Sequence, residues 1–316
     1  MTTQDPSVLV LCGGLSAERD VSLRSGSRVA EALRGLGFDV ATADVDAALV
    51  PRLIVRRPDC VIPVLHGAAG EDGALRDVLA SLLLPFVGST ASASRLAFDK
   101  PVANRLLTGA GLSVPPAVAL PHATFRELGA TAVLGVLVDA LGLPLVVKPT
   151  KGGSSLGTSI VHDPAELPAA MVGAFAYGEV ALIQAYVEGT EVAVSVVDDG
   201  SGARALPPVE IVPDTGFYDY TARYTAGTTE FFAPARLSPE VAEAACAAAL
   251  MAHGTLGLRD YSRTDLIVDP EGTCWFLEVN VAPGLTETSL MPQSLHAART
   301  DLGHLMASLT RLAVLR

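Results

Sequence analysis

Residues 261–280, YSRTDLIVDPEGTCWFLEVN, decide the fold. Residues 269–272, DPEG, are typical of a turn and lie between two apolar runs, which predicts a β-hairpin. Side chains alternate faces along a strand, so Arg263 shares a face with Asp265, and Glu278 shares a face with Asn280. If the turn holds an even number of residues, such as DPEG, we expect all four side chains on the same side of the hairpin.

This face predicts a metal site. Asp265, Glu278 and Asn280 offer hard oxygen ligands of the kind that Mg²⁺ prefers when it shares its coordination sphere with phosphates. Arg263 adds a guanidinium beside them. The alternative is a hairpin with a solvated polar face. The metal site is favoured because the two carboxylates interrupt strands that are otherwise apolar.

A second stretch, KPTKGGSSLG at residues 148–157, resembles a phosphate-binding loop. It lacks the Lys-Ser/Thr ending of the Walker pattern and the G-x-G-x-x-G spacing of the dinucleotide fingerprint. Its glycines and serines offer backbone N–H groups and hydroxyls to phosphate oxygens, and Lys148 adds a point charge. Alone, it would be an ordinary glycine-rich turn. Together with the metal face, it predicts a nucleotide site held between two β elements.

The first third of the chain alternates short apolar runs with amphipathic stretches, which predicts a parallel sheet covered by helices. LSVPPAV at 112–118 is the best linker, because its two prolines break any helix. Strands become more frequent after it. Expected strands lie within 7–14, 38–45, 59–67, 84–89, 143–148, 158–161, 180–187, 191–199 and 209–212, and expected helices within 22–37, 72–83, 98–111, 165–176 and 239–256.

Composition narrows the function classes. Of 316 residues, 50% are hydrophobic and 18% charged, which indicates a globular protein. The net charge of −12, without a basic cluster, argues against nucleic-acid binding. The most apolar window, 131–147, contains an aspartate, a proline and two glycines, so we expect no membrane span. We see no signal peptide. Cys12, Cys60, Cys246 and Cys274 lack C-x-x-C spacing, which favours buried, reduced thiols in a cytoplasmic protein.

In their order along the chain, eight motifs resemble the D-alanine–D-alanine ligase family of ATP-grasp enzymes. They are GGLSAERDVSLRSG, LHGAAGEDG, FDK, VVKPTKGGSSLG, VEGTEVAV, YDYTARY, RTDLIV and EVNVAPGLTETSLMP. Each motif is weak alone, but this order is specific and covers nearly the whole chain. The resemblance implies an α/β protein with a Rossmann-like N-terminal domain (1–114) and two α+β ATP-grasp subdomains, one central and ATP-binding (115–207) and one C-terminal (208–316). It also implies a homodimer through the N-terminal domain.

The resemblance implies a reaction as well. In the family, ATP phosphorylates the carboxylate of a first D-alanine, and the amine of a second attacks the acyl phosphate, giving the dipeptide used in peptidoglycan. The implied ATP contacts are Lys100 and Lys148 on the phosphates, Ser155 in the loop, Gln184, Tyr186 and Val187 near adenine, and Glu191 on the ribose. The implied ligands of two Mg²⁺ ions, with Mn²⁺ as an alternative, are Asp265, Glu278 and Asn280.

The remaining implied residues contact the amino acids. Without the family, we would interpret His66 as an ordinary loop histidine. The resemblance implies that Glu18 orients the ammonium of the first amino acid and joins Ser154 and Tyr224 in a hydrogen-bonded triad, and that His66 faces the same amino acid. It implies that Arg263 and the Gly284 N–H form the oxyanion site. Ser289 and Leu290 would bind the carboxylate of the second amino acid, and Arg223 would lie in the lid YDYTARY.

Four positions depart from the family pattern. Arg223 replaces the usual lid lysine, and a planar, forked guanidinium is not geometrically equivalent to an ammonium. Gln184 stands where a glutamate is common, Gly152 where some members have glutamate, and Val281 where threonine is usual. None of these changes removes an essential ligand. Tyr224 is retained, and family members that use D-lactate lack that tyrosine, so an amine acceptor is favoured.

Three alternatives stay open. A related ligase could use another amino acid or amine, or an intramolecular nucleophile; Arg223 and Val281 keep this interpretation open. A nucleotide-binding protein without catalysis would be expected to lack metal ligands, yet they are present. A generic ATP-grasp carboxylase or glutamate-adding ligase would have no reason to carry Glu18, YDYTARY and TSL in these places.

Overall fold

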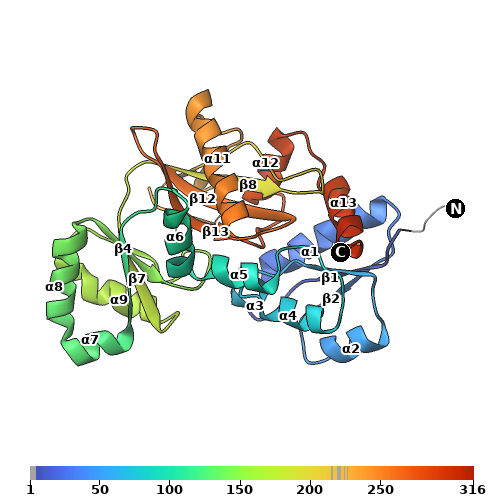
Figure 1. Ribbon diagram of the computed structural model, residues 1–316, viewed down its shortest axis with the longest axis horizontal. Coiled ribbons are helices and arrows are strands. Elements are labelled where there is room, and N and C mark those ends of the chain that lie inside the picture. The colour runs from blue at the N-terminus through green and yellow to red at the C-terminus, as the bar shows by residue number, and fades with distance from the viewer. Residues whose placement is uncertain (1–4, 215, 219–221, 224, 226) are drawn as a thin grey trace.

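The computed structural model describes residues 5–214, 216–218, 222–223, 225 and 227–316. Its N-terminal part contains a parallel three-stranded sheet of order β2-β1-β3 with helices packed around it (Figure 1). The strands are short and largely buried because helices cover them, as expected for a parallel sheet. This confirms the predicted α/β class. The elements are β1 (Val8–Leu11), α1 (Arg19–Gly35), β2 (Val40–Ala43), α2 (Leu49–Val55), β3 (Cys60–Pro63), α3 (Ala68–Glu71), α4 (Ala74–Ser81), α5 (Ala91–Phe98) and α6 (Lys100–Gly109).

The prediction of a fourth strand within 84–89 is wrong. That segment makes only one parallel bridge, between Phe86 and Val61 of β3. Pro85 has no N–H to donate, and Gly88 turns the backbone to φ +107°. The chain therefore leaves the sheet after one pair.

The central part is a four-stranded antiparallel sheet of order β4-β7-β5-β6. The apolar window 131–147 does not form one element, because Gly142 at φ +74° ends a helix and the chain returns as a strand. Helices α7 and α8 were not predicted. The elements are β4 (Ala117–Pro121), α7 (His122–Leu128), α8 (Ala130–Leu141), β5 (Leu145–Pro149), β6 (Ser159–Val161), the 3₁₀ turn η1 (Pro164–Glu166), α9 (Leu167–Phe175) and β7 (Val180–Ala185).

The C-terminal part is built on a six-stranded sheet of order β11-β10-β8-β12-β13, with β9 paired to β8. Strand β8 precedes the expected boundary at 207/208 but pairs with strands that follow it. The boundary stays a prediction. The elements are β8 (Thr190–Val197), β9 (Arg204–Ala205), β10 (Val209–Pro213), β11 (Thr229–Phe232), α11 (Pro239–Thr255), β12 (Tyr261–Val268), β13 (Cys274–Asn280), α12 (Leu290–Ala297) and α13 (Leu302–Val314).

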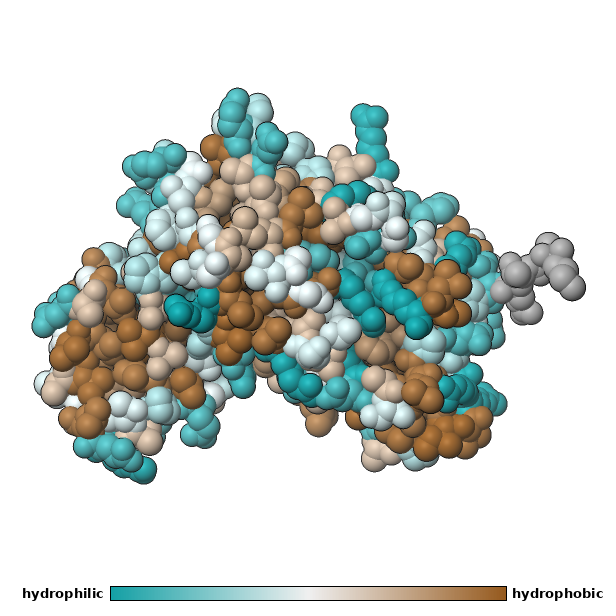
Figure 2. All heavy atoms as spheres, viewed as in Figure 1, coloured by the Kyte–Doolittle hydropathy of each residue, from teal (hydrophilic) through white to brown (hydrophobic). Residues whose placement is uncertain are grey.

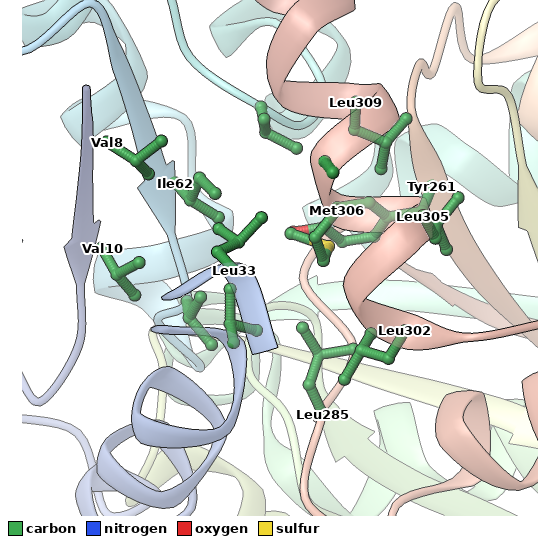
Figure 3. Packing of buried hydrophobic residues seen from close by; sticks show 14 of the residues in the cluster. Val8, Val10, Leu33, Ile62, Tyr261, Leu285, Leu302, Leu305, Met306 and Leu309 are labelled. Atoms are coloured by element: carbon green, nitrogen blue, oxygen red, sulfur yellow. The ribbon is translucent and has the colours of Figure 1, made fainter. Parts of the chain in front are cut away.

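The two ends of the chain share one core. Figure 3 shows Met306 and Leu309 of helix α13 near Leu33 and Ile62 of the N-terminal part. Tyr261 at the start of β12 is buried in the same cluster. Burial of these apolar side chains therefore ties the C-terminal sheet to the parallel sheet, and loops from both parts can contribute to one site.

Two further expectations concern the whole chain. No helix within the described residues is long and apolar enough to cross a membrane. All four cysteines are free thiols. Cys12 and Cys60 are buried as predicted, whereas Cys246 and Cys274 are only partly buried and pack against the core of the C-terminal part.

Candidate active site

The β12–β13 hairpin brings its polar side chains together. Arg263 pairs with Asn280, and Asp265 pairs with Glu278. The prediction of an even turn is wrong, because residues 269–273 separate the last pair. A β-bulge beside Asp265 leaves one extra residue in β13, and this restores the alternation that the odd turn would have reversed. The prediction that the four side chains share a face is therefore confirmed.

On this face each carboxylate has a cationic partner. The Arg263 guanidinium donates to both oxygens of Asp265, at 2.7 and 2.8 Å. Lys100 Nζ lies 3.1 Å from Glu278 Oε2. Burial would raise the pKa of Glu278, but Lys100, Lys148 and Arg223 outweigh it and lower the pKa to about 2. Glu278 is therefore fully ionised at neutral pH.

Lys100 is positioned by the start of helix α6. The side chain of Asp99 caps this helix by accepting from Val102 N, and Pro101 occupies the first turn. Lys100 Nζ also donates to the carbonyl of Gly152 at 2.9 Å. One ammonium therefore connects the Gly-Ser loop to the hairpin.

Lys148 lies at the end of β5, beside the same charges, and is 8% exposed. Burial, followed by the charge of Lys100, lowers the pKa of its ammonium to about 8. In the loop that follows, Ser154 and Ser155 have φ of 53° and 55°. This left-handed conformation is rare for residues other than glycine and is found at ligand-binding turns.

A cavity of about 400 Å³ lies between the four-stranded and six-stranded sheets. Apolar side chains from both sheets line it together with the Gly-Ser loop, which suits a planar base with a phosphate tail. Burial raises the pKa of Glu191 to about 7, although Arg223 opposes the shift. The buried Gln184 amide is 3.5 Å from the Pro115 carbonyl. The cavity brings together all seven predicted ATP contacts, namely Lys100, Lys148, Ser155, Gln184, Tyr186, Val187 and Glu191.

A second cavity, of about 600 Å³, adjoins the first. The two share a set of lining residues that we call the junction: Lys100, Gly152, Gly153, Tyr218, Arg223 and Glu278. The second cavity brings together the predicted substrate residues Glu18, His66, Ser154, Arg223, Arg263, Asn280, Gly284, Ser289 and Leu290. A ligand in one cavity can therefore meet a ligand in the other beside the charges of the junction.

The guanidinium of Arg223 lies over the Tyr218 ring, 4.2 Å from its centre. Its Nε donates to the Tyr218 carbonyl at 3.4 Å, and this carbonyl also accepts from Ser155 Oγ at 3.0 Å. The lid segment is thus connected to the Gly-Ser loop in the free protein. Tyr224 lies outside the described residues.

Glu18 precedes helix α1 and contacts the Gly-Ser loop. Ser154 Oγ donates to Glu18 Oε1 at 2.6 Å, which joins segments 136 positions apart in sequence. These two residues are the pair predicted within the triad, and the predicted third member, Tyr224, lies outside the described residues. A charge-assisted hydrogen bond of this kind fixes the loop at the wall of the second cavity.

His66 follows β3 and is 4% exposed. Its Nδ1 is 2.8 Å from the Ala282 carbonyl, an acceptor, so Nδ1 carries the proton. Burial lowers the pKa of the imidazole, so the ring is neutral, and Nε2 has no partner among the described residues. Beside it, Glu71 accepts from Gly67 N at 2.8 Å. Burial, then the charge of Glu18, raises the pKa of Glu71 to about 8.

Gly284 contacts Ser289 closely at the other wall. A Cβ on Gly284 would lie 2.7 Å from Ser289 Oγ. The Ser289 hydroxyl is 2.7 Å from Thr286 Oγ1 and accepts from Thr286 N at 3.2 Å. Ser289 does not cap helix α12 with its side chain, so the helix start remains open toward the cavity.

Comparison with known proteins places this geometry in a family. The family profile described as "D-ala D-ala ligase C-terminus" matches residues 106–311. The D-alanine–D-alanine ligase of Anaeromyxobacter sp. (strain K) is 43% identical over 286 residues, which cover 90% of this chain and 90% of that protein. The D-alanine–D-alanine ligase of Moorella thermoacetica is 39% identical over 307 residues, which cover 97% of this chain and 99% of that protein. The chain belongs to the D-alanine–D-alanine ligase family.

Solved structures agree. The VanG D-Ala:D-Ser ligase from Enterococcus faecalis superimposes with a TM-score of 0.85 at 28% identity and covers 98% of this chain and 100% of that one. The D-alanine–D-alanine ligase from Bacillus anthracis superimposes with a TM-score of 0.82 at 29% identity and covers 98% of this chain and 97% of that one. The same enzyme complexed with ATP gives 0.78 at 28% identity. The fold is therefore that of an ATP-grasp ligase.

The family's metal chemistry can be tested against the donors present. Among the described residues, no three His, Cys, Asp or Glu side chains converge on a metal position. The donor set is instead two paired carboxylates and an amide, Asp265, Glu278 and Asn280. Such a set is incomplete alone but suits Mg²⁺, which keeps water and phosphate ligands. The Asn280 Oδ1 accepts from Ala282 N at 2.8 Å, so one ligand atom is already oriented. The residues fit the ion.

Several lining residues were not predicted from the family motifs. Glu71 lies inside the motif LHGAAGEDG, and its buried carboxyl could have been suspected there. Ile267 in the first cavity and Arg24 in the second also lie inside motifs, whereas Ile160, Phe231 and Gln293 come from segments without motifs. No local sequence signal identifies them, because only the packing of remote elements brings them to the site.

Proposed function

We propose that the protein is an ATP-dependent D-alanine–D-alanine ligase that makes D-alanyl-D-alanine for peptidoglycan through an acyl phosphate. The observation that carries the proposal is the meeting of the two cavities at the junction. A nucleotide in the first would present its γ-phosphate to a carboxylate in the second. Lys100 and Arg223, both at that boundary, oppose the negative charge that otherwise keeps the two anions apart.

In the first step a carboxylate oxygen of the donor D-alanine attacks the γ-phosphorus, and ADP leaves. The donor must lie with its carboxylate at the junction and its ammonium on the far side. Glu18 there supplies a carboxylate oxygen, fixed by Ser154 at 2.6 Å, and His66 is neutral and so does not repel the ammonium. The donor is thus oriented along one axis.

In the second step the free amine of the acceptor attacks the acyl carbon and a tetrahedral oxyanion forms. The bond between the acyl carbon and the phosphate oxygen then breaks, and the proton lost by the nitrogen leaves with the phosphate. Arg263 and the Gly284 N–H line the wall where that oxygen would lie. The guanidinium is held rigidly by Asp265, so little reorganisation is needed when charge develops. A closed lid would exclude water, which would otherwise hydrolyse the acyl phosphate.

Asp265, Glu278 and Asn280 would hold Mg²⁺, or Mn²⁺ in its place, when the nucleotide is bound. The ion would supply positive charge to the phosphates. In the free protein Lys100 and Arg263 balance the two carboxylates instead. These cations therefore keep the ligand set assembled before the nucleotide arrives.

The structure also bears on assembly. Val50, Ile54 and Val55 of α2 and Leu83 after α4 are exposed, with Val55 at 83% and Leu83 at 79%. Figure 2 shows apolar side chains gathered at this lower right edge. We propose that a second copy covers this patch to form a homodimer in the cytoplasm. Sedimentation velocity at micromolar concentration tests this, and a monomer would contradict it.

The catalytic proposal is tested by phosphate release with ATP and Mg²⁺ across D- and L-amino acids, with mass spectrometry of the products. We expect turnover that depends on D-alanine and yields D-alanyl-D-alanine. D-serine belongs in the panel because the VanG relative is a D-Ala:D-Ser ligase. Phosphate release that gives only a different product would transfer the assignment to a ligase with another acceptor, and ATP binding without turnover would refute catalysis.

A further inference from the structure

Helix α1 lies along the wall of the second cavity. Ser25 Oγ accepts from Leu285 N at 3.0 Å, and Arg28 Nη1 donates to the Leu285 carbonyl at 3.0 Å. One turn earlier, Val21 Cγ1 would lie 3.7 Å from a Cβ on Gly284. One face of the helix is therefore fixed against the segment that leads into α12.

Arg24 projects from the edge of this face. At 100° per residue it lies about 60° around the helix from Val21. It is exposed and lines the second cavity together with Thr288, Ser289 and Gln293. Within the described part of the chain, Arg24 makes no hydrogen bond and no ion pair, whereas Arg263 is committed to Asp265.

The other cationic side chains of this cavity have different positions. Lys100 and Arg223 belong to the junction, and Arg263 pairs with Asp265 beside it. At the wall formed by residues 286–293, Arg24 is the one cation among the described lining residues, and Glu287 adds a negative charge there. An anion at this wall would have no other counter-charge.

An acceptor amino acid has to place an anion there. Its amine must point to the acyl carbon at the junction, so its α-carboxylate points away from it. Ser289 can offer a hydroxyl, but that group already exchanges a hydrogen bond with Thr286. We propose that Arg24 binds the α-carboxylate of the acceptor and sets the affinity of the second amino-acid site. This inference rests on the proposed function, because it presupposes an acceptor.

The expected effect follows from the chemistry of the contact. A guanidinium can donate two parallel hydrogen bonds to a carboxylate, and solvent exposure weakens the pair. Removing it should raise the acceptor KM about tenfold. The donor KM should not change, because Glu18, Ser154 and His66 serve the donor. Lysine should restore part of the affinity, since it keeps the charge without the fork.

The test compares Arg24→Gln and Arg24→Lys with the wild type and with Arg56→Gln, a matched loss of one exposed charge from an arginine that lines neither cavity. Initial rates of dipeptide formation over a wide D-alanine range give the two KM values. A second series uses D-alaninamide, which has the amine but no carboxylate, as acceptor with D-alanine as donor. Melting temperatures of all variants control for folding.

We expect Arg24→Gln to raise only the acceptor KM, and its kcat/KM with D-alaninamide to match that of the wild type. An unchanged acceptor KM would overturn the inference, as would an equal loss with D-alanine and D-alaninamide, since that pattern indicates a structural role. If the wild type makes dipeptide and Arg24→Gln behaves like Arg56→Gln, only the inference on Arg24 fails. If the wild type makes no dipeptide, the proposed function fails and this inference with it.

Discussion

Lys148 carries a positive charge in a place that disfavours it until a nucleotide binds. Its side chain is 8% exposed, and its ammonium makes no hydrogen bond or ion pair within the described part of the chain. Burial and the charge of Lys100 lower the pKa of this group from 10.5 to about 8. At 1.36 kcal/mol for each pKa unit, keeping Lys148 charged at neutral pH costs the free protein ~3 kcal/mol.

Lys148→Met should therefore stabilise the free protein. Methionine has similar length and no charge to desolvate. We expect the free energy of unfolding to rise by ~2–3 kcal/mol and the melting temperature by ~5 °C. Lys151→Met is the matched control, because Lys151 is 60% exposed and its ion pair with Asp99 at 3.3 Å is a surface contact. Its effect should stay within ~0.5 kcal/mol.

ATP should remove most of this difference in stability between the variant and the wild type. At 100 times its Kd, a ligand adds ~2.7 kcal/mol to the stability of the wild type. Losing a charged phosphate contact should raise the Kd ~10–100-fold, which leaves Lys148→Met with a much smaller gain at the same concentration. Calorimetric melting with and without ATP, Mg²⁺ and no amino acid measures both effects. A free Lys148→Met protein less stable than the wild type by ~1 kcal/mol or more would refute the reasoning.

The pH dependence gives a second check on the same substitution. Below pH 8 the folded and unfolded chains both carry the Lys148 proton, so the advantage of Lys148→Met is constant. Between about 8 and 10.5 only the unfolded wild type keeps that proton. The stability of the wild type therefore rises with pH relative to the variant, and the difference should shrink steadily across this window.

Three further predictions concern neighbouring groups. Glu71→Gln should stabilise the protein increasingly from pH 4.5 to about 8, because the folded wild type must hold a proton that the unfolded chain releases. Above about pH 8 the advantage should stay constant. Thermal melts at several pH values measure this, and a stability difference that does not depend on pH would contradict it. Glu278→Gln should lower the rate of dipeptide formation by ~100-fold or more and destabilise the fold by ~1–3 kcal/mol, since Lys100 loses its partner; wild-type rates at saturating ATP would exclude the metal role. Gly284→Ala should lower the free energy of unfolding by ~1–2 kcal/mol and lower kcat/KM for the acceptor, because the new Cβ would lie 2.7 Å from Ser289 Oγ. Unchanged kinetics would show that the segment around Ser289 can shift to accommodate the methyl group.

Much of the fold could be predicted from local patterns. The runs that became β1, β5 and β8 are apolar and bounded by turn residues, and each forms a strand close to the expected limits. Helix α8, in the apolar window before β5, was missed, because an apolar run has the same composition whether it is a buried strand or a helix. The single bridge at Phe86 shows the opposite error, since a β-like run was ended by the proline and glycine beside it.

The site was predictable where chemistry and periodicity agree. Asp265 and Glu278 face each other as expected, but through a bulge that no local signal announces. The contact of Ser154 with Glu18 depends on packing between segments 136 positions apart, and spacing alone could not predict it. The perturbed pKa of Glu71 has the same origin, because it depends on burial and on a neighbouring carboxylate brought there by the fold.

The charges explain how an acidic chain can bind a polyanion. The net charge is −12, yet Lys100, Lys148 and Arg223 act on the carboxylate of Glu278, and Arg263 pairs with that of Asp265. Beside these two carboxylates the cations are in local excess, although Glu18, Glu191 and Glu287 line other parts of the two cavities. The walls of the cleft have a low dielectric, so the field of these cations is weakly screened. Because the pKa of Lys148 is already low, part of this excess is held at a cost that nucleotide phosphates would remove. The same charges that destabilise the free protein would therefore strengthen nucleotide binding.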